Sequence, residues 1–387
     1  MRSVITLNSL LIRLSLLSLL LLLLPPSLSS SSPSSSTGGA TAGATHAVIV
    51  STSRYWFNYR HASNALSIYH LLKSRGVHDD NIVLMLADDM PNNVRNVETG
   101  KMYGERSRVN DLYKDVQVDY NGRDVTVETF LQVLSGRHSP STPPGRRLHT
   151  TPTSNVLIYL TGHGGSEFLK FQDSTEVSSQ DLSLVFSEMN LLQRYGKILL
   201  IVDTCQAGTL SDSFTVSSVP NLFFIGSSSK DENSYAHHTD SYLGVAVIDR
   251  YTRAILEFFQ RRYERESTVK DFIEGTDDEK KLRARVSCWS GFEGDEKGAG
   301  VLLRWFFGNE VKGVGVIGGG VLKGGGGEEV GIEEINSHKE EVEEAKDVIG
   351  EVVEEVKYYD IEEVRRFNYL LGIAGVFIAA SVAWEVL

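Results

Sequence analysis

The chain has 387 residues, of which 41% are hydrophobic and 23% are charged. This share of apolar residues excludes a disordered protein and suffices for the core of one large domain or of two smaller ones. The formal net charge is −12, and no stretch clusters Lys and Arg as phosphate binding requires. A nucleic acid is therefore not an expected partner.

The N-terminal residues have the layout of a secretory signal. Arg2 and Arg13 precede an almost unbroken run of leucines over Leu14–Leu24, and small residues follow. We therefore expect residues 1–29 to be a signal peptide. An uncleaved anchor is the alternative, although the leucine run is short for a membrane span. The residues that follow, 30–44, are rich in Ser, Gly and Ala and predict a flexible leader.

Short apolar strands alternate with helices over residues 45–307. This alternation predicts one α/β domain with a mostly parallel sheet flanked by helices. The expected strands cover His46–Ser51, Ile82–Ala87, Val156–Leu160, Ile198–Val202 and Leu222–Ile225. The expected helices cover Ala62–Lys73, Asp181–Tyr195 and Gly244–Arg262, and a loop is expected over Lys230–His238.

The C-terminal residues predict a linker followed by a membrane span. Residues 308–364 are first rich in Gly and then in Glu, and no Lys-Ser or Lys-Thr pair turns the glycines into a phosphate-binding loop. Residues 367–387 contain the almost entirely apolar Tyr369–Val386, which is long enough for a transmembrane helix in a thin bilayer such as that of the endoplasmic reticulum. A buried core helix is the alternative. Together with a signal peptide, this segment predicts a single-pass membrane protein whose residues 45–307 face the lumen.

Two of the expected strands lead directly into a reactive side chain. Val156–Gly165 (VLIYLTGHGG) contains His163, and Ile198–Gly208 (ILLIVDTCQAG) contains Cys205. Because the carboxyl ends of parallel strands share one edge of a sheet, both residues are expected at the same rim. A thiol, an imidazole and glycine amides supply a nucleophile, a base and oxyanion donors, which is the chemistry of acyl transfer.

Each of these two residues also has a structural interpretation. Since the chain has 2 cysteines, Cys205 is a reactive thiol, a buried inert cysteine or one half of a bridge to Cys288. His163 alone would also suit a structural histidine, but the glycines beside it let backbone amides approach a ligand closely. We favour the reactive interpretation of both residues.

Longer motifs around these residues carry a family resemblance. The motifs are YLTGHGG over residues 159–165, DTCQ over 203–206, SRYWFNYRH over 53–61 and VLMLADDM over 83–90. They resemble the catalytic subunits of glycosylphosphatidylinositol (GPI) anchor transamidases, which belong with legumain and, more distantly, with the caspases. The resemblance covers residues 45–259 and implies a caspase-type fold for a lumenal catalytic domain over residues 45–307.

The resemblance implies roles for particular residues. Cys205 would be the nucleophile of a cysteine-dependent transamidase, His163 its general acid and base, and Asn58 the residue that orients His163. The backbone N–H groups of Gly164 and Cys205 would form the oxyanion hole. Cys205 would form a thioester with a proprotein while expelling its C-terminal signal, and the ethanolamine amine of a GPI lipid would then open the thioester.

The resemblance also implies a structural calcium ion, although the chemistry itself requires no cofactor. Its ligands would be Asp79, the main-chain oxygen of Ile82, Gln117 and Asp119, since calcium prefers oxygen ligands. Gln117 stands where the family usually has Glu, which would weaken binding. Solvated surface carboxylates are the alternative interpretation.

The resemblance further implies a location in the endoplasmic reticulum membrane. The expected partners are the other subunits of a membrane-embedded transamidase complex, the C-terminal signal of the proprotein and the GPI lipid. The family has a cysteine that bridges to a partner subunit, where this chain has Asn92, so assembly would be noncovalent. Two other functions remain open: a legumain-like asparaginyl endopeptidase and a non-enzymatic subunit kept for assembly.

Overall fold

The computed structural model describes residues 43–293 and 298–309. The predicted signal peptide and transmembrane helix lie outside the described residues, as do most of the predicted leader and linker. Within the described ranges, no helix combines the length and the apolar character needed to cross a membrane.

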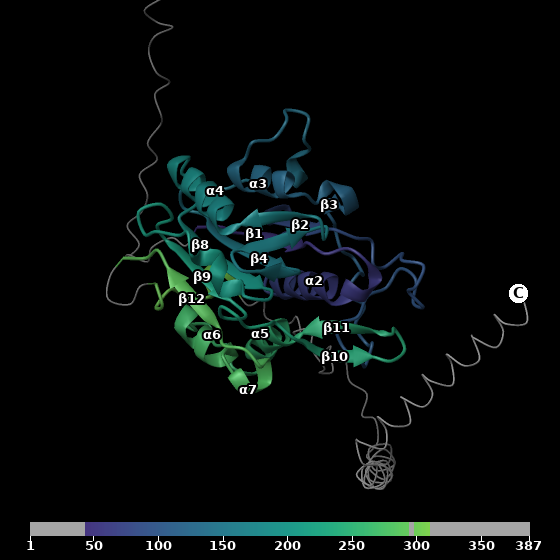
Figure 1. Cartoon of the computed structure of the whole chain (residues 1–387). Coiled ribbons are helices and arrows are strands. Elements are labelled where there is room, and N and C mark those ends of the chain that lie inside the picture. Colours follow the sequence, from purple (N-terminus) through teal and green to yellow (C-terminus); the bar gives the residue numbers. More distant parts are fainter. Residues whose placement is uncertain (1–42, 294–297, 310–387) are drawn as a thin grey trace, which may run out of the picture. The chain divides into compact units, whose positions relative to one another are not determined.

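A seven-stranded sheet in the order β12-β9-β8-β4-β1-β2-β3 forms the centre of the described chain (Figure 1). All its neighbouring strands pair in parallel except β12, which is antiparallel to β9. The strands are β1 (Thr45–Ser51), β2 (Ile82–Leu86), β3 (Tyr120–Asn121), β4 (Asn155–Thr161), β8 (Lys197–Asp203), β9 (Leu222–Gly226) and β12 (Ser287–Ser290). The predicted α/β class with a mostly parallel sheet is thus confirmed.

Helices cover both faces of this sheet, and the alternation of side chains along each strand supplies both cores. Ala47 and Ile49 of β1 pack into one core, whereas Val48 and Val50 pack into the other. Figure 1 shows α3 and α4 on one side of the sheet and α2, α5 and α6 on the other. The helices are α2 (Tyr59–Ser74), α3 (Val127–Ser135), α4 (Ser179–Leu191), α5 (Arg250–Arg261), α6 (Val269–Thr276), α7 (Glu279–Leu282) and α8 (Arg304–Phe307).

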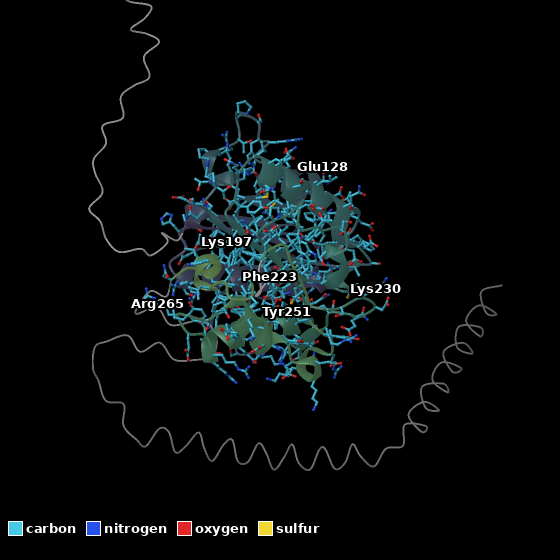
Figure 2. The ribbon with its side chains drawn as sticks, turned by 90° about the vertical axis from the view of Figure 1, so that its left-hand side faces the viewer. Glu128, Lys197, Phe223, Lys230, Tyr251 and Arg265 are labelled. Carbon is cyan, nitrogen blue, oxygen red and sulfur yellow. The ribbon has the colours of Figure 1, made fainter. Side chains whose placement is uncertain are left out.

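The side chains follow this layering from centre to surface. Figure 2 shows Phe223 and Tyr251 amid the densely packed interior, where both are buried, whereas the exposed side chains of Glu128, Lys230 and Arg265 lie at the periphery. The apolar strands are therefore covered on both faces, as a parallel sheet requires.

The prediction of a helix over Gly244–Arg262 is wrong for the first part of that range. Val245–Asp249 form the strand β11, which pairs in an antiparallel ladder with β10 (Ala236–Asp240), and helix α5 begins only at Arg250. The alternating buried positions Val245 and Val247 favour the strand. The expected loop over Lys230–His238 is likewise interrupted, because its last three residues belong to β10.

The residues beyond α6 complete the core. Cys288 of β12 pairs with Ile225 at one edge of the sheet. Phe307 of α8 is fully buried, and its ring centroid lies 4.5 Å from that of Phe259 and 5.9 Å from that of Phe272. Residues far from the predicted motifs therefore hold the helices of one face in place.

Candidate active site

His163 and Cys205 stand at equivalent positions beyond two adjacent parallel strands. Thr161 ends β4 and Asp203 ends β8, and the two residues are paired across the ladder. His163 and Cys205 each follow two residues later, so the register brings both to the same edge of the sheet. The Thr204 hydroxyl donates a hydrogen bond to the Gly162 carbonyl (2.9 Å), which ties the two segments together. The predicted common rim is thus observed.

The glycines beside His163 are required by close backbone approach. A Cβ atom at Gly162 would lie 2.0 Å from Thr52 Oγ1, and one at Gly164 would lie 2.6 Å from Thr204 Oγ1 and 2.8 Å from the Phe168 carbonyl oxygen. These contacts leave no room for a side chain. The glycines therefore let the chain segment after β4, which contains His163, pack tightly against its neighbours.

Asn58 is hydrogen bonded to His163, as the resemblance implied. Its Oδ1 lies 2.8 Å from His163 Nε2, and its Nδ2 donates to the Arg54 carbonyl (2.7 Å). Because a carbonyl oxygen can only accept, this second bond turns the Asn58 Oδ1 toward the ring. His163 Nε2 therefore carries the hydrogen, and its Nδ1 is left as the basic atom.

Asn58 reaches His163 at the expense of a helix cap. Asparagine is a preferred N-cap residue, and Asn58 occupies that position before α2. Its side chain nevertheless makes no cap hydrogen bond, and it is fully buried against His163 and Arg54. Because the Asn58 side chain binds His163 and does not cap α2, we infer a functional role for it.

The Cys205 thiol lies half-buried in a tight turn. Gln206, which follows it, adopts a left-handed conformation with φ 52°, and the Gln206 N–H donates to the Glu232 carbonyl (2.8 Å). Sγ of Cys205 lies 3.9 Å from the Ser234 carbonyl oxygen. Cys205 and Cys288 are both free, so the bridge considered from the sequence is not formed.

The electrostatic surroundings keep both reactive groups neutral. Burial raises the pKa of the Cys205 thiol, so the resting nucleophile is protonated at neutral pH. Burial, reinforced by the nearby Arg60 charge, lowers the pKa of His163 below its ordinary value of 6.5. A neutral imidazole is a base ready to accept the thiol proton.

Two backbone N–H groups are available at this edge. A small antiparallel sheet consists of β5 (Gly164–Gly165), β6 (Phe168–Phe171) and β7 (Thr175–Ser178). In this sheet Gly164 is paired with Leu169, and the Lys170 N–H donates to the His163 carbonyl next to that pair (2.8 Å). Because hydrogen-bonded and non-hydrogen-bonded pairs alternate, Gly164 and Leu169 form a non-hydrogen-bonded pair, and the Gly164 N–H points away from β6. Within the described part of the chain, the Cys205 N–H has no acceptor, whereas the Gln206 N–H is engaged. This arrangement is compatible with the expected oxyanion donors.

A buried polar network around Asp249, which no sequence motif predicted, lies beside the site. The Asp249 carboxylate accepts from Arg60 Nε (3.0 Å) and Asn64 Nδ2 (2.6 Å), and its Oδ2 lies 3.8 Å from His61 Nε2. Burial and the neighbouring Asp203 carboxylate raise the pKa of Asp249 to about 6. Arg60 and His61 are the last two residues of the motif SRYWFNYRH that contains Asn58, so proximity in sequence was a usable signal. Asp249 carried none, because it fell inside the expected helix.

Asp203 links this network to the loop that contacts the thiol. Its Oδ1 accepts from the Ser234 hydroxyl (2.8 Å), and its Oδ2 accepts from the Thr252 hydroxyl (2.7 Å). The Ser234 carbonyl accepts the hydrogen bond of the Cys205 thiol (3.9 Å). Asp203 therefore fixes the position of the chain segment that faces the nucleophile.

Three of the expected calcium ligands gather around the Tyr69 hydroxyl. Tyr69 donates to Asp79 Oδ1 (2.7 Å), and its oxygen accepts from the main-chain N–H of Gln117 (3.5 Å). Burial and the Asp79 charge raise the pKa of Asp119 to about 7, and Asp119 Oδ2 accepts from the Leu84 N–H (2.9 Å). The ammonium of Lys73 lies 3.3 Å from Asp79 Oδ2, so a cationic side chain already pairs with one of these carboxylates. The described residues contain no group of three or more His, Cys, Asp or Glu side chains suited to a metal.

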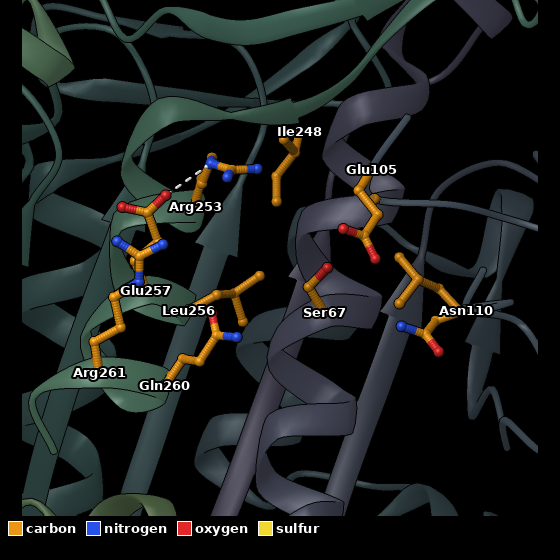
Figure 3. Close-up of a pocket in the computed structure, with 11 residues that line it drawn as sticks. Ser67, Glu105, Asn110, Ile248, Arg253, Leu256, Glu257, Gln260 and Arg261 are labelled. Carbon is orange, nitrogen blue, oxygen red and sulfur yellow. Dashed lines mark hydrogen bonds and ion pairs between the residues drawn. The ribbon is translucent and has the colours of Figure 1, made fainter. Parts of the chain in front are cut away.

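A separate pocket lies between α2 and α5 (Figure 3). It measures about 190 Å³, and Figure 3 shows Ser67 of α2 facing Leu256 and Gln260 of α5 across it, with Glu105 and Asn110 at one side. None of the expected site residues lines this pocket. The reactive edge of the sheet and this pocket are therefore distinct places in the molecule.

The chain is similar to known proteins over the part that carries this site. It is 47% identical over 223 residues to the GPI-anchor transamidase of Saccharomyces cerevisiae, a match that covers 57% of this chain and 54% of the relative. It is 46% identical over 230 residues to the GPI-anchor transamidase of Schizosaccharomyces pombe, covering 59% and 60% respectively. The match thus spans little more than half the length of these relatives.

Two further comparisons concern the fold and the family. The crystal structure of Caspase-1 from Spodoptera frugiperda aligns with a TM-score of 0.40 and 12% identity, covering 70% of this chain and 92% of that one. The model of the Peptidase C13 family matches residues 45–282, which include Asn58, His163 and Cys205. The chain therefore belongs to the Peptidase C13 family.

Proposed function

We propose that this chain is the catalytic subunit of a GPI transamidase, in which Cys205 and His163 transfer a proprotein from its C-terminal signal to the amine of a GPI lipid. The observation that carries the proposal is the placement of Asn58, His163 and Cys205 at one edge of the sheet. Similarity to two GPI-anchor transamidases supports the acceptor.

The first step follows from the neutral state of both groups. His163 takes the Cys205 proton as Sγ attacks the carbonyl carbon at the attachment site, and the negative charge collects on the carbonyl oxygen. The N–H groups of Gly164 and Cys205 would stabilise that oxygen. Asn58 Oδ1 accepts from His163 Nε2, so it stabilises the imidazolium that forms. The imidazolium then protonates the departing nitrogen, and the C–N bond breaks to leave a thioester.

The second step decides between transfer and hydrolysis. His163 removes a proton from the incoming nucleophile, which attacks the thioester carbonyl and releases the Cys205 thiol. An amine held beside the thioester has a large effective molarity compared with water. Because a GPI lipid and the proprotein signal are both membrane-associated, a chain in the endoplasmic reticulum membrane with a lumenal catalytic domain would supply this proximity.

The calcium ion expected from the resemblance fits the donor set of Asp79, Ile82, Gln117 and Asp119. Oxygen donors suit calcium, and its charge would favour the ionised form of Asp119, whose pKa is raised by burial and, to a smaller extent, by the Asp79 charge. When bound, the ion would stabilise the fold and supply no catalytic chemistry. The Gln117 amide makes the set less negative than one with a glutamate.

Assembly with other subunits would be noncovalent at the position of Asn92. Asn92 is exposed, and its Nδ2 donates to both oxygens of the Asp89 carboxylate at 3.0 Å. This position offers a polar surface and no thiol. A partner subunit would therefore bind here through hydrogen bonds.

Complementation tests the proposed function. In cells that lack their own catalytic subunit, the wild-type chain should restore anchoring of a reporter, whereas Cys205→Ala and His163→Ala should not. Cys288→Ser is the matched control and should restore it fully, because Cys288 pairs with Ile225 at the edge of the sheet and has no assigned part in the chemistry. Anchored reporter in cells that express Cys205→Ala would refute the thioester mechanism.

A further inference from the structure

The backbone at Tyr55, close to Asn58, is strained. Its φ of 71° and ψ of 144° fall in a region that glycine adopts freely and that other residues avoid. Such a conformation costs on the order of 1–3 kcal/mol and persists only where the surroundings enforce it. The conformation of Tyr55 must therefore be held by contacts with other segments.

Two carboxylates from separate segments bind this stretch of backbone. Asp88, which follows β2, accepts from the Tyr55 N–H through Oδ2 (2.7 Å). Asp173, in the turn between β6 and β7, accepts from the Arg54 N–H through Oδ2 (3.0 Å). The turn is itself held, since the Gln172 N–H donates to the Thr52 carbonyl (2.7 Å). The N–H groups of Arg54 and Tyr55 are therefore both bound by acids.

The carbonyl groups of the same two residues bind Asn58. The Arg54 carbonyl accepts from Asn58 Nδ2 (2.7 Å), and the Tyr55 carbonyl accepts from the Asn58 N–H (2.9 Å). The first of these bonds turns Oδ1 toward His163. One short segment thus connects two carboxylates on one side to the orientation of the catalytic imidazole on the other.

We propose that Asp88 and Asp173 are positioning residues that hold the Arg54–Tyr55 backbone so that Asn58 presents Oδ1 to His163. This inference rests on the proposed function, in which His163 is the acid and base. Without the carboxylates, Tyr55 relaxes toward negative φ, and the Arg54 carbonyl moves away from Nδ2. The Asn58 amide then loses its fixed orientation, and His163 loses its fixed tautomer.

Substitution of the two carboxylates gives the first test. In microsomes that contain the full chain, Asp88→Ala and Asp173→Ala should each slow transfer of a proprotein reporter to hydrazine between about tenfold and about 100-fold, the range expected when catalytic groups are displaced. Asp271→Ala is the matched control, because its carboxylate likewise binds a backbone N–H, that of Thr268 before α6 (2.7 Å), and not the Arg54–Tyr55 segment. It should leave the rate within about twofold of wild type.

A double-mutant cycle separates positioning from general structural damage. In an Asn58→Ala background, Asp88→Ala should change the residual rate less than about twofold, because the group it positions is gone. Tyr55→Gly gives a second cycle: glycine adopts the observed φ without strain, so Asp88→Ala should cost less beside Gly than beside Tyr. Equal losses in all backgrounds would overturn the inference in favour of a purely structural role.

The pH profile distinguishes the two carboxylates. The charged groups that act on His163 are Arg60 of α2, Lys170 of β6 and Asp173, and the ring of the titratable His61 packs against the His163 ring with a centroid distance of 5.0 Å. Asp173 raises the pKa of His163, so Asp173→Asn should move the acid limb of the rate to lower pH. Asp88→Asn keeps an acceptor and removes no charge that acts on the ring, so its acid limb should stay in place. An unchanged limb in Asp173→Asn would contradict this part of the inference.

The parent mechanism is tested in the same preparation. Rates of Asp88→Ala and Asp173→Ala equal to that of Asp271→Ala, beside an inactive Cys205→Ala, would overturn the positioning inference and leave the proposed function standing. An active Cys205→Ala would overturn the proposed function, and the inference with it.

Discussion

Asn58→Ala offers the sharpest prediction for the hydrogen bonds of the site. The substitution removes Oδ1, which lies 2.8 Å from His163 Nε2 in a fully buried position. That bond is strongest when the ring carries its second proton, because hydrogen bonds to charged groups contribute about 1.5–3 kcal/mol. If the whole of this contribution is lost in the transition state, the rate should fall roughly 10- to 150-fold, at about 1.4 kcal/mol for each factor of ten.

The assay for Asn58→Ala is the initial rate of hydrazide formation by microsomes with matched amounts of chain. The loss should appear in kcat, because Asn58 contacts the imidazole and its neighbouring backbone and no substrate contact is required of it. The substitution also leaves the Arg54 carbonyl without its donor, so protease resistance of the chain must be compared in parallel. A folded Asn58→Ala chain that works within about twofold of wild type would refute the assignment of Asn58.

Three further predictions concern packing, protonation and metal binding. Gly162→Ala should destabilise the chain by about 1–3 kcal/mol, because the new Cβ would lie 2.0 Å from Thr52 Oγ1, and Thr52→Ala in the same chain should restore protease resistance; an unaffected single variant would contradict the packing. On the acid side the rate should fall only below pH 6.5, since His163 must be neutral to act and its pKa is lowered; an acid limb centred above pH 7 in a pH–rate profile would contradict this. Calcium chelation should lower the midpoint temperature of protease resistance, and Asp119→Asn should abolish that response; a chelator effect of equal size in both chains would exclude Asp119 as a ligand.

The sheet and the reactive pair could be predicted because their signals are local. Short runs of aliphatic residues mark β4 and β8, and each run continues directly into His163 or Cys205. The equal offset of both residues from a paired strand end then follows from parallel register alone. Chemistry that depends on adjacent strand ends is therefore accessible from the sequence.

The parts that could not be predicted depend on contacts between distant segments. Nothing near Asp249 signals that it binds Arg60, because the two residues are 189 positions apart. The edge strand β12 is short and only partly buried, so its pattern resembles that of a loop. The strain at Tyr55 is also invisible in the sequence, since aromatic residues usually favour extended backbone.

Trapping of the acyl intermediate tests the central claim most directly. Microsomes that contain the chain would be supplied with a proprotein reporter and hydrazine, and the C-terminus of the released product would be identified by mass spectrometry. A hydrazide that forms with the wild-type chain and is absent with Cys205→Ala is the predicted result. A product with a free carboxyl terminus at saturating hydrazine, or a hydrazide that forms without the Cys205 thiol, would contradict the account.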